Sequence, residues 1–265
     1  MNNDVVPLNP NHHQGLRLLK AQPYHHAAGM MLCPVGSSEM ATVARDYVIV
    51  FPMEADGVPQ VLLGSEAGRN AYLSSSGHWL CRYVPAHVRR FPFVVGHDPV
   101  HTDGSRRRFS VLIQEDAPHF SYTEGELLFQ PDGQPAPLLQ QVQKALSALQ
   151  ADHLATQTMV QQLDALGLLV ARSIVVHLKD GKEHALSGFR MLDVPKFQAL
   201  DAAHLAALHG SGALMLAYAH IVALSNLRDG VLVQRPALPR SDALTSGDFG
   251  IPFLDEEPID FSMFN

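Results

Sequence analysis

Three residues of this 265-residue sequence have the types and order of a non-haem iron site. His101 and Asp103 form an H-x-D pair, and His177 follows much later in the chain. Two histidines and a carboxylate that leave open positions on Fe(II) are the ligand set of many oxygenases. Because the chain has 15 histidines, about one such pair is expected by chance. An iron-dependent oxygenase with Fe(II) as cofactor is therefore the alternative hypothesis for function.

A second group of residues suggests binding rather than catalysis. The segment 77–93, GHWLCRYVPAHVRRFPF, contains the only tryptophan together with tyrosine, phenylalanine and three arginines. Arginine planes stack on aromatic rings and pair with carboxylates or phosphates. A strand, a turn and a second strand with buried aromatic rings would use the same residues. The segment is thus either core or a ligand-binding site, whose candidate residues are Trp79, Arg82, Tyr83, Arg89, Arg90 and Phe93.

The end of the chain differs from the rest in charge. Residues 241–265 hold six acidic residues and no Lys or Arg, so they contribute −6 of the formal net charge of −7 and leave −1 for residues 1–240. Acidic residues alternate there with aromatic ones, which is typical of disordered segments that fold on a partner. We predict a disordered acidic tail over 236–265. A protein partner would contact it through Phe249, Phe253, Asp255, Glu256, Glu257, Phe261 and Phe264, and disorder without a partner is the alternative.

Other function classes find no support in the sequence. Residues 64–68, GSEAG, place the serine one position too early for a nucleophile elbow, and no Walker A motif or strand-linked G-x-G-x-x-G is present. The net negative charge, and the lack of aromatic residues interleaved with the basic run at 106–108, argue against nucleic acid as a partner. The sequence therefore favours a non-catalytic protein.

The elements that must position these residues change type along the chain. From about 46 to 129, short apolar runs alternate with turns, which predicts strands at 47–51, 60–64, 79–84, 91–96, 108–114 and 126–129. The first two form a hairpin through Asp56-Gly57. From Pro137 the apolar spacing becomes helical and predicts helices at 137–149 and 153–166, separated at Ala151-Asp152. The first half is therefore strand-rich and the second half helical.

The helical half also contains a second hairpin. Its strands flank Asp180-Gly181, a pair typical of tight turns. A short helix is expected at 195–200, and an apolar helix at 201–227 with a break at 210–212. His209 and His220 lie in that apolar helix and are expected to be core or boundary residues. The predicted architecture is α+β, with one domain over 1–235 and the tail over 236–265.

Cellular location follows from the cysteines and the apolar segments. Cys33 and Cys81 are too far apart in sequence for a redox or zinc motif, which favours a reducing compartment. The N-terminal residues lack the pattern of a secretory signal. The most apolar segment, 212–227, is shorter than the ~20 residues that cross a bilayer. We expect a soluble cytoplasmic protein without a membrane span.

Six stretches between about residues 10 and 230 resemble, in order, the bacterial SapC family. They are ARDYVIVF (44–51), LLGSEAGRNAYL (62–73), GHWLCRYVPAHVRRFPF (77–93), ELLFQPDGQPAPLL (126–139), LVARSIVVHLKDGKEHALSGFRMLD (169–193) and LHGSGALMLAYAHIVALSNL (208–227). The resemblance implies a small soluble bacterial protein, and the family name carries no enzymatic activity with it. Family members are expected near genes for outer-membrane uptake receptors and for oxygenases or halogenases. It implies an accessory or binding role in an uptake or surface-associated system.

Overall fold

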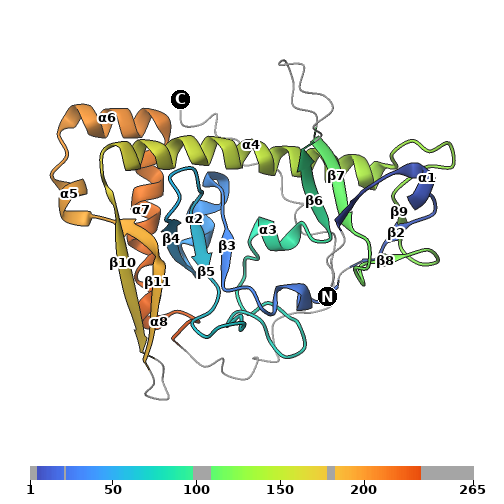
Figure 1. The fold of residues 1–265 in the computed structure, drawn as a ribbon, viewed down its shortest axis with the longest axis horizontal. Coiled ribbons are helices and arrows are strands. Elements are labelled where there is room, and N and C mark those ends of the chain that lie inside the picture. Colours follow the sequence, from blue (N-terminus) through green and yellow to red (C-terminus); the bar gives the residue numbers. More distant parts are fainter. Residues whose placement is uncertain (1–4, 21, 98–108, 178–182, 234–265) are drawn as a thin grey trace. The chain divides into compact units, whose positions relative to one another are not determined.

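A computed structural model describes residues 5–20, 22–97, 109–177 and 183–233 (Figure 1). Their mixed α/β architecture has most strands in the N-terminal half and most helices in the C-terminal half. The chain divides into two compact units. The first lies within Met1–Gln22 and Arg89–Gln150, and the second within Pro23–Val88 and Ala151–Ala243. Each unit has its own hydrophobic core.

The first unit is built from two small antiparallel sheets. One has the strand order β1-β7-β6 and the other β8-β2-β9. Its core contains Phe93, Ile113, Leu128 and Val142. The elements of this unit are β1 (Val5–Pro7), α1 (Pro10–His13), β2 (Arg17–Leu18), β6 (Phe93–His97), β7 (Phe109–Gln114), β8 (Phe120–Ser121), β9 (Glu126–Leu127) and the first part of α4 (Pro137–Ala165).

The second unit contains a five-stranded antiparallel sheet of order β10-β11-β4-β5-β3. Strand β4 is central and all of its residues are buried, which explains its continuous apolar sequence VIVFP. The strands are β3 (Leu32–Pro34), β4 (Val48–Pro52), β5 (Gln60–Leu62), β10 (Leu169–His177) and β11 (Glu183–Leu192).

Short helices connect these strands, and longer ones follow them. They are η1 (His25–Ala27), η2 (Ser37–Glu39), α2 (Met40–Val43), α3 (Ala86–Arg89), α5 (Val194–Gln198), α6 (Ala202–Ser211), α7 (Ala213–Ala223) and α8 (Asn226–Asp229). Helix α7 packs against β4 and β11 (Figure 1). Within the described ranges no single helix is long and apolar enough to cross a membrane. The pair Ala202–Ser211 and Ala213–Arg228 meets that test jointly, with a bend of 93°.

His220 of α7 joins two strands where their ladder ends. Strands β11 and β4 pair at Phe189↔Pro52 and Arg190↔Phe51. Nearby, the Leu192 N–H donates to His220 Nε2 at 3.3 Å, and His220 Nδ1–H donates to the Ile49 carbonyl at 2.9 Å. Burial lowers the pKa of His220 from 6.5 to about 4, so the ring stays neutral and can accept from Leu192. His220 is thus a core residue, within the core or boundary placement that the sequence predicted, whereas His209 is exposed.

Several predicted elements are confirmed. The β4–β5 hairpin and the β10–β11 hairpin both form, and the helix break expected at 210–212 occurs at Gly212, which has φ +83°. Of the strand expected at 126–129, only the first two residues form one, as β9 (Glu126–Leu127).

Two predictions are wrong. Residues 79–84 form no strand, because the polar tips of Trp79 and Tyr83 bond to other segments of the second unit; Trp79 keeps only an isolated bridge with Leu73. The helices expected at 137–149 and 153–166 form one helix, α4. Asp152 does not start a second helix, because its carboxylate accepts hydrogen bonds from Ser37 Oγ and Ser38 Oγ, both at 2.7 Å.

Candidate functional site

The predicted site segment contributes its tryptophan to a group of rings in the second unit. Tyr47 and Tyr72 stack with their centroids 4.6 Å apart, and Tyr72 stacks on Trp79 at 6.4 Å. Tyr24 meets Trp79 edge-on at 5.8 Å. Tyr47 and Tyr72 are fully buried, whereas Tyr24 and Trp79 are partly buried. We call these four residues the aromatic cluster.

Hydrogen bonds connect the polar tips of the rings. Trp79 Nε1–H donates to the Tyr47 hydroxyl at 2.6 Å, and the Tyr47 hydroxyl donates to the Tyr83 carbonyl. The Tyr72 hydroxyl donates to the Asp46 carbonyl at 3.1 Å. Buried tyrosine and tryptophan usually find such partners, because an unpaired polar atom in the core is costly. The bonds fix residues 79–83 against the segment that precedes β4.

Glu39 is a buried carboxylate beside this segment. Its Oε2 accepts from the Tyr83 hydroxyl at 2.8 Å and from the Ala86 N–H at 2.9 Å, and its Oε1 accepts from the Gly36 N–H at 3.3 Å. A buried carboxylate is tolerated only where such donors replace water. Glu39 therefore fixes both the Tyr83 side chain and the first residue of α3.

The loop that carries Trp79 is held by its own backbone geometry. Gly77 has φ +80°, and a Cβ there would lie 2.6 Å from Pro23 Cβ and 2.7 Å from His25 Nε2, so only glycine fits. Asn70 is buried, donates to the Ala27 carbonyl at 3.0 Å and accepts from the Tyr72 N–H at 2.8 Å. Asn70 therefore fixes the backbone before Trp79 in the chain, and Gly77 allows the close turn that leads into Trp79.

Burial keeps the titratable groups around the cluster in their uncharged forms. It raises the pKa of the Cys81 thiol from 9.0 to about 12, with a further contribution from Asp46. It also raises the pKa of Tyr47 and of Tyr72, and the nearby Cys81 acts in the same direction. Burial lowers the pKa of His26 to about 4, although the bond from His26 Nε2 to the Val88 carbonyl partly opposes this. At neutral pH these groups are a thiol, two phenols and a neutral imidazole.

The structure places the six predicted ligand-binding residues in different surroundings. Trp79 and Tyr83 belong to the hydrogen-bonded network, and Arg82 lies between them with its side chain exposed. These three residues are in the second unit, whereas Arg89, Arg90 and Phe93 are in the first.

In the first unit the side chains at the end of the segment face protein. Arg90 Nη1 donates to the Phe93 carbonyl at 3.1 Å, and Arg89 is half-buried. Phe93 is a core residue and meets Phe120 edge-on at 5.8 Å. Little of the Phe93 ring is therefore available to a ligand. Binding through the remaining residues stays a prediction.

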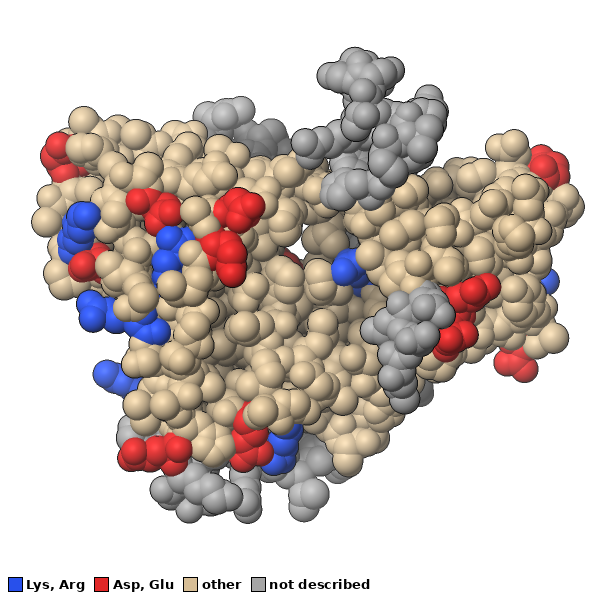
Figure 2. Space-filling model, viewed as in Figure 1, with Lys and Arg blue, Asp and Glu red and all other residues tan. Residues whose placement is uncertain are grey.

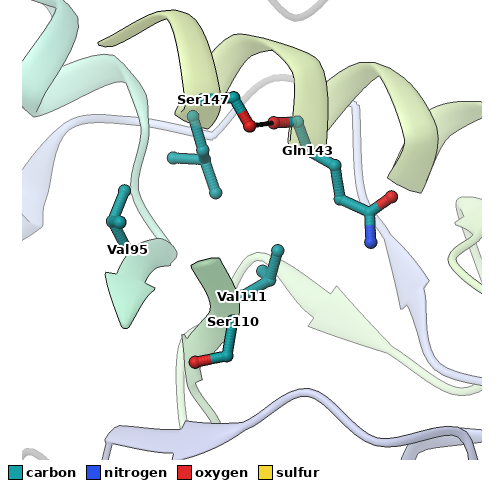
Figure 3. A pocket seen from close by; sticks show the side chains of 6 residues that line it. Val95, Ser110, Val111, Gln143 and Ser147 are labelled. Atoms are coloured by element: carbon teal, nitrogen blue, oxygen red, sulfur yellow. Dashed lines mark hydrogen bonds between the residues drawn. The ribbon is translucent and has the colours of Figure 1, made fainter. Parts of the chain in front are cut away.

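A small pocket of the first unit lies at another place (Figure 3). It has a volume of about 100 Å³, and ligand pockets usually exceed roughly 300 Å³. The Ser147 hydroxyl donates to the Gln143 carbonyl at 2.8 Å, within α4. The lining residues are uncharged and belong to β6, β7 and α4: Val95, Ser110, Val111, Gln143, Leu146 and Ser147.

The iron hypothesis and the tail hypothesis concern residues that the structure does not describe. His101 and Asp103 lie outside the described ranges, and so does the side chain of His177. Among the residues that are described, no three His, Cys, Asp or Glu side chains gather in a way that could hold a metal ion. The tail candidates from Phe249 to Phe264 also lie outside, so both hypotheses stay predictions.

Sequence reasoning missed the partners of Trp79. Tyr47 was included only as a strand residue, and Glu39 and Tyr72 were not singled out. A polar ring at the start of a fully apolar strand, as in the run YVIVF, is a usable signal, because its hydroxyl needs a partner in the core. Glu39 follows two serines at the start of a helix, a position where a carboxylate can cap the backbone.

The SapC family model matches residues 8–229, which is most of the chain. The chain belongs to the SapC family. The match includes the aromatic cluster, both hairpins and helices α6 and α7. Comparison with curated proteins found no match, and neither did comparison with solved structures. The comparisons therefore establish family membership. The function is inferred from the residues of this chain.

Proposed function

We propose that this SapC-family protein is a non-catalytic accessory or binding protein of the cytoplasm, which supports an outer-membrane uptake or surface-associated system. The observation that carries the proposal is the state of the polar groups around Trp79. The side-chain oxygens and nitrogen of Tyr47, Tyr83 and Trp79 are engaged in hydrogen bonds within the fold.

These groups are poorly suited to nucleophilic or acid–base catalysis. A reactive cysteine has a lowered pKa, and a general base has a pKa near the working pH. Cys81 has its pKa raised to about 12, and His26 has its pKa lowered to about 4. The raised pKa keeps Cys81 as the weakly nucleophilic thiol, and the lowered pKa makes His26 a weak base with almost no cationic form to act as an acid. Both shifts support a role in holding a surface rather than in bond making.

Arg82 lies between Trp79 and Tyr83, on the surface that their hydrogen bonds keep in one conformation. Arg82 is an exposed residue, and its two neighbours in the network, Trp79 and Tyr83, are fixed by hydrogen bonds. An arginine on a rigid backbone loses less entropy when it binds a carboxylate or phosphate. Because residues 1–240 have a formal charge of only −1, repulsion of an acidic partner is weak. The proposed partner is therefore a protein or ligand that presents an acidic group.

Cytoplasmic location belongs to the same proposal. Cys33 is a buried free thiol and Cys81 a partly buried one, and free thiols persist in reducing compartments. Cell fractionation with an antibody against the chain tests this directly. Recovery in the periplasmic fraction would contradict it.

One experiment tests both the non-catalytic and the binding part. The tagged protein is purified from its native cell, its iron content is measured, and co-purified proteins are quantified for wild type, Arg82→Glu and the control Arg172→Glu on the exposed part of β10. We expect far less than one iron per chain and a partner lost only with Arg82→Glu. About one iron per chain would favour the oxygenase hypothesis. Equal capture by all three proteins would contradict binding through Arg82.

A further inference from the structure

Helix α7 has apolar residues on two opposite sides. One side is buried in the core of the second unit and includes Leu216, Ala217 and His220. On the other side Met215 is 37% exposed, Tyr218 54% and Val222 57%. Their spacing of three and four residues places them on one stripe of the helix. We call these three residues the outer face of α7.

The two helices α6 and α7 contain no formally charged residue. Between Ala202 and Leu227 the sequence contains no Asp, Glu, Lys or Arg. The exposed residues of α6 are only alanine, histidine and glycine. In Figure 2 most of the surface over α6 is tan, with one acidic patch at its left end, and basic and acidic groups intermingle below it. Depletion of charge with aromatic and methionine side chains is the composition of an interface centre.

We propose that the outer face of α7 is the contact between two copies of this chain, related by a two-fold axis that passes near Tyr218. A two-fold axis brings each residue near it against the same surface of the other copy, so a charged residue there would face its own equivalent. An uncharged apolar stripe avoids this repulsion and is complementary to itself. Met215, Tyr218 and Val222 also have the 3-4 spacing by which two helices interdigitate.

Helix α6 provides the remaining area. A stable interface covers about 800 Å² on each copy, which is more than three side chains of an eleven-residue helix supply. The small exposed residues of α6, which contacts α7, allow a second backbone to approach closely. The proposed contact therefore includes the exposed alanines of α6 beside the outer face of α7.

Two other occupants fit this surface less well. The acidic residues of segment 241–265 would find no Lys or Arg between Ala202 and Leu227. Helices that lie on lipid carry Lys and Arg on their polar side, whereas the opposite side of α7 is protein core. A second copy is the occupant that the charge pattern favours, and the other two become outcomes of the test.

The test is the mass of the full chain by sedimentation equilibrium, over concentrations from about 1 to 100 µM. We expect twice the 29.0 kDa of one chain. Tyr218→Glu and Val222→Glu should each weaken the dimer about 100-fold or more, because each introduces a charge that faces its own copy. Tyr122→Glu is the matched control: Tyr122 is 61% exposed in the first unit, and its replacement should leave the mass unchanged. Circular dichroism establishes that each variant is folded.

A cross-link locates the axis. Tyr218→Cys should form a disulfide-linked pair under mild oxidation, and Tyr122→Cys should not. Several results would overturn the proposal: a monomer at every concentration, a dimer unaffected by both glutamate variants, or absence of the cross-link. Dimerisation only after deletion of residues 241–265 would assign the face to the tail. Flotation of monomeric protein with neutral lipid vesicles would assign it to a membrane surface.

Discussion

The aromatic cluster and the outer face of α7 place the same kinds of side chain in opposite surroundings. Tyr47 and Tyr72 are buried, and their hydroxyls donate to backbone carbonyls within the second unit. Tyr218 is largely exposed, and its ring meets Phe197 edge-on at 5.4 Å. Buried polar groups with partners specify one conformation, whereas exposed apolar groups favour association. The aromatic cluster therefore stabilises the fold around the proposed Arg82 surface, whereas the outer face of α7 is the proposed contact with a second copy.

The largest expected effect concerns Glu39. Glu39→Ala leaves the Tyr83 hydroxyl and the backbone N–H groups of Ala86 and Gly36 without their acceptor. We expect a loss of about 4 kcal/mol in the free energy of unfolding, measured by urea denaturation. The exposed Glu124 gives the matched control. Glu124→Ala should change the free energy of unfolding by less than about 0.5 kcal/mol. Equal losses of unfolding free energy in the two variants would contradict a stabilising role for the hydrogen bonds of Glu39.

Acid should destabilise the fold through its neutral histidines. The folded-state pKa of His220 is about 4 and the unfolded value is 6.5, so the unfolded chain binds the proton first as pH falls. The stability is fully present above pH 6.5 and is lost as pH falls to about 4. The loss is on the order of 3 kcal/mol for His220, and His26 acts in the same direction.

The His220→Gln variant isolates this effect. It lacks the titrating ring, so the difference in unfolding free energy between wild type and variant should narrow as pH falls from 6.5 to about 4. Urea denaturation at several pH values measures it. A difference that stays constant over that range would show that His220 is not kept neutral by the fold.

The smallest expected effects come from removing a single tyrosine hydroxyl in each region. Tyr47→Phe removes the hydroxyl that accepts from Trp79 and donates to the Tyr83 carbonyl, so it should cost about 2 kcal/mol of unfolding free energy. Tyr218→Phe removes an exposed hydroxyl and should cost less than about 0.5 kcal/mol. Thermal or urea unfolding of the monomer measures both. Similar costs would break the contrast between the buried and the exposed tyrosines.

The sequence predicted best those parts of the fold that depend on neighbouring residues. Both pairs of strands flank an Asp-Gly pair in the sequence, and Gly212 ends α6 with a positive φ. The helix α4 was predicted as two helices, because Asp152 is a common helix start and nothing local shows that Ser37 and Ser38 bind its carboxylate. Contacts between residues so distant in sequence are set by tertiary packing, which overrides local preference.

The candidate site shows the same limit. The sequence identified Trp79 and Tyr83, because aromatic residues next to arginines and prolines are conspicuous. It gave no indication that Trp79 donates to Tyr47 or that Tyr83 donates to Glu39, since these partners come from different segments. The burial that sets the pKa of Cys81 likewise arises only once those segments pack together.

The fold holds the titratable groups around Trp79 uncharged, and the reactivity of the Cys81 thiol measures this effect. The rate of modification by an aromatic disulfide reagent at pH 8 is measured for Cys33→Ser, which leaves Cys81 as the only thiol. Because burial raises the pKa of Cys81 to about 12, the native protein should react at least about 100-fold more slowly than the urea-unfolded chain. A native rate equal to or above the unfolded rate would mean that Cys81 is a reactive thiolate and that the fold does not hold it uncharged.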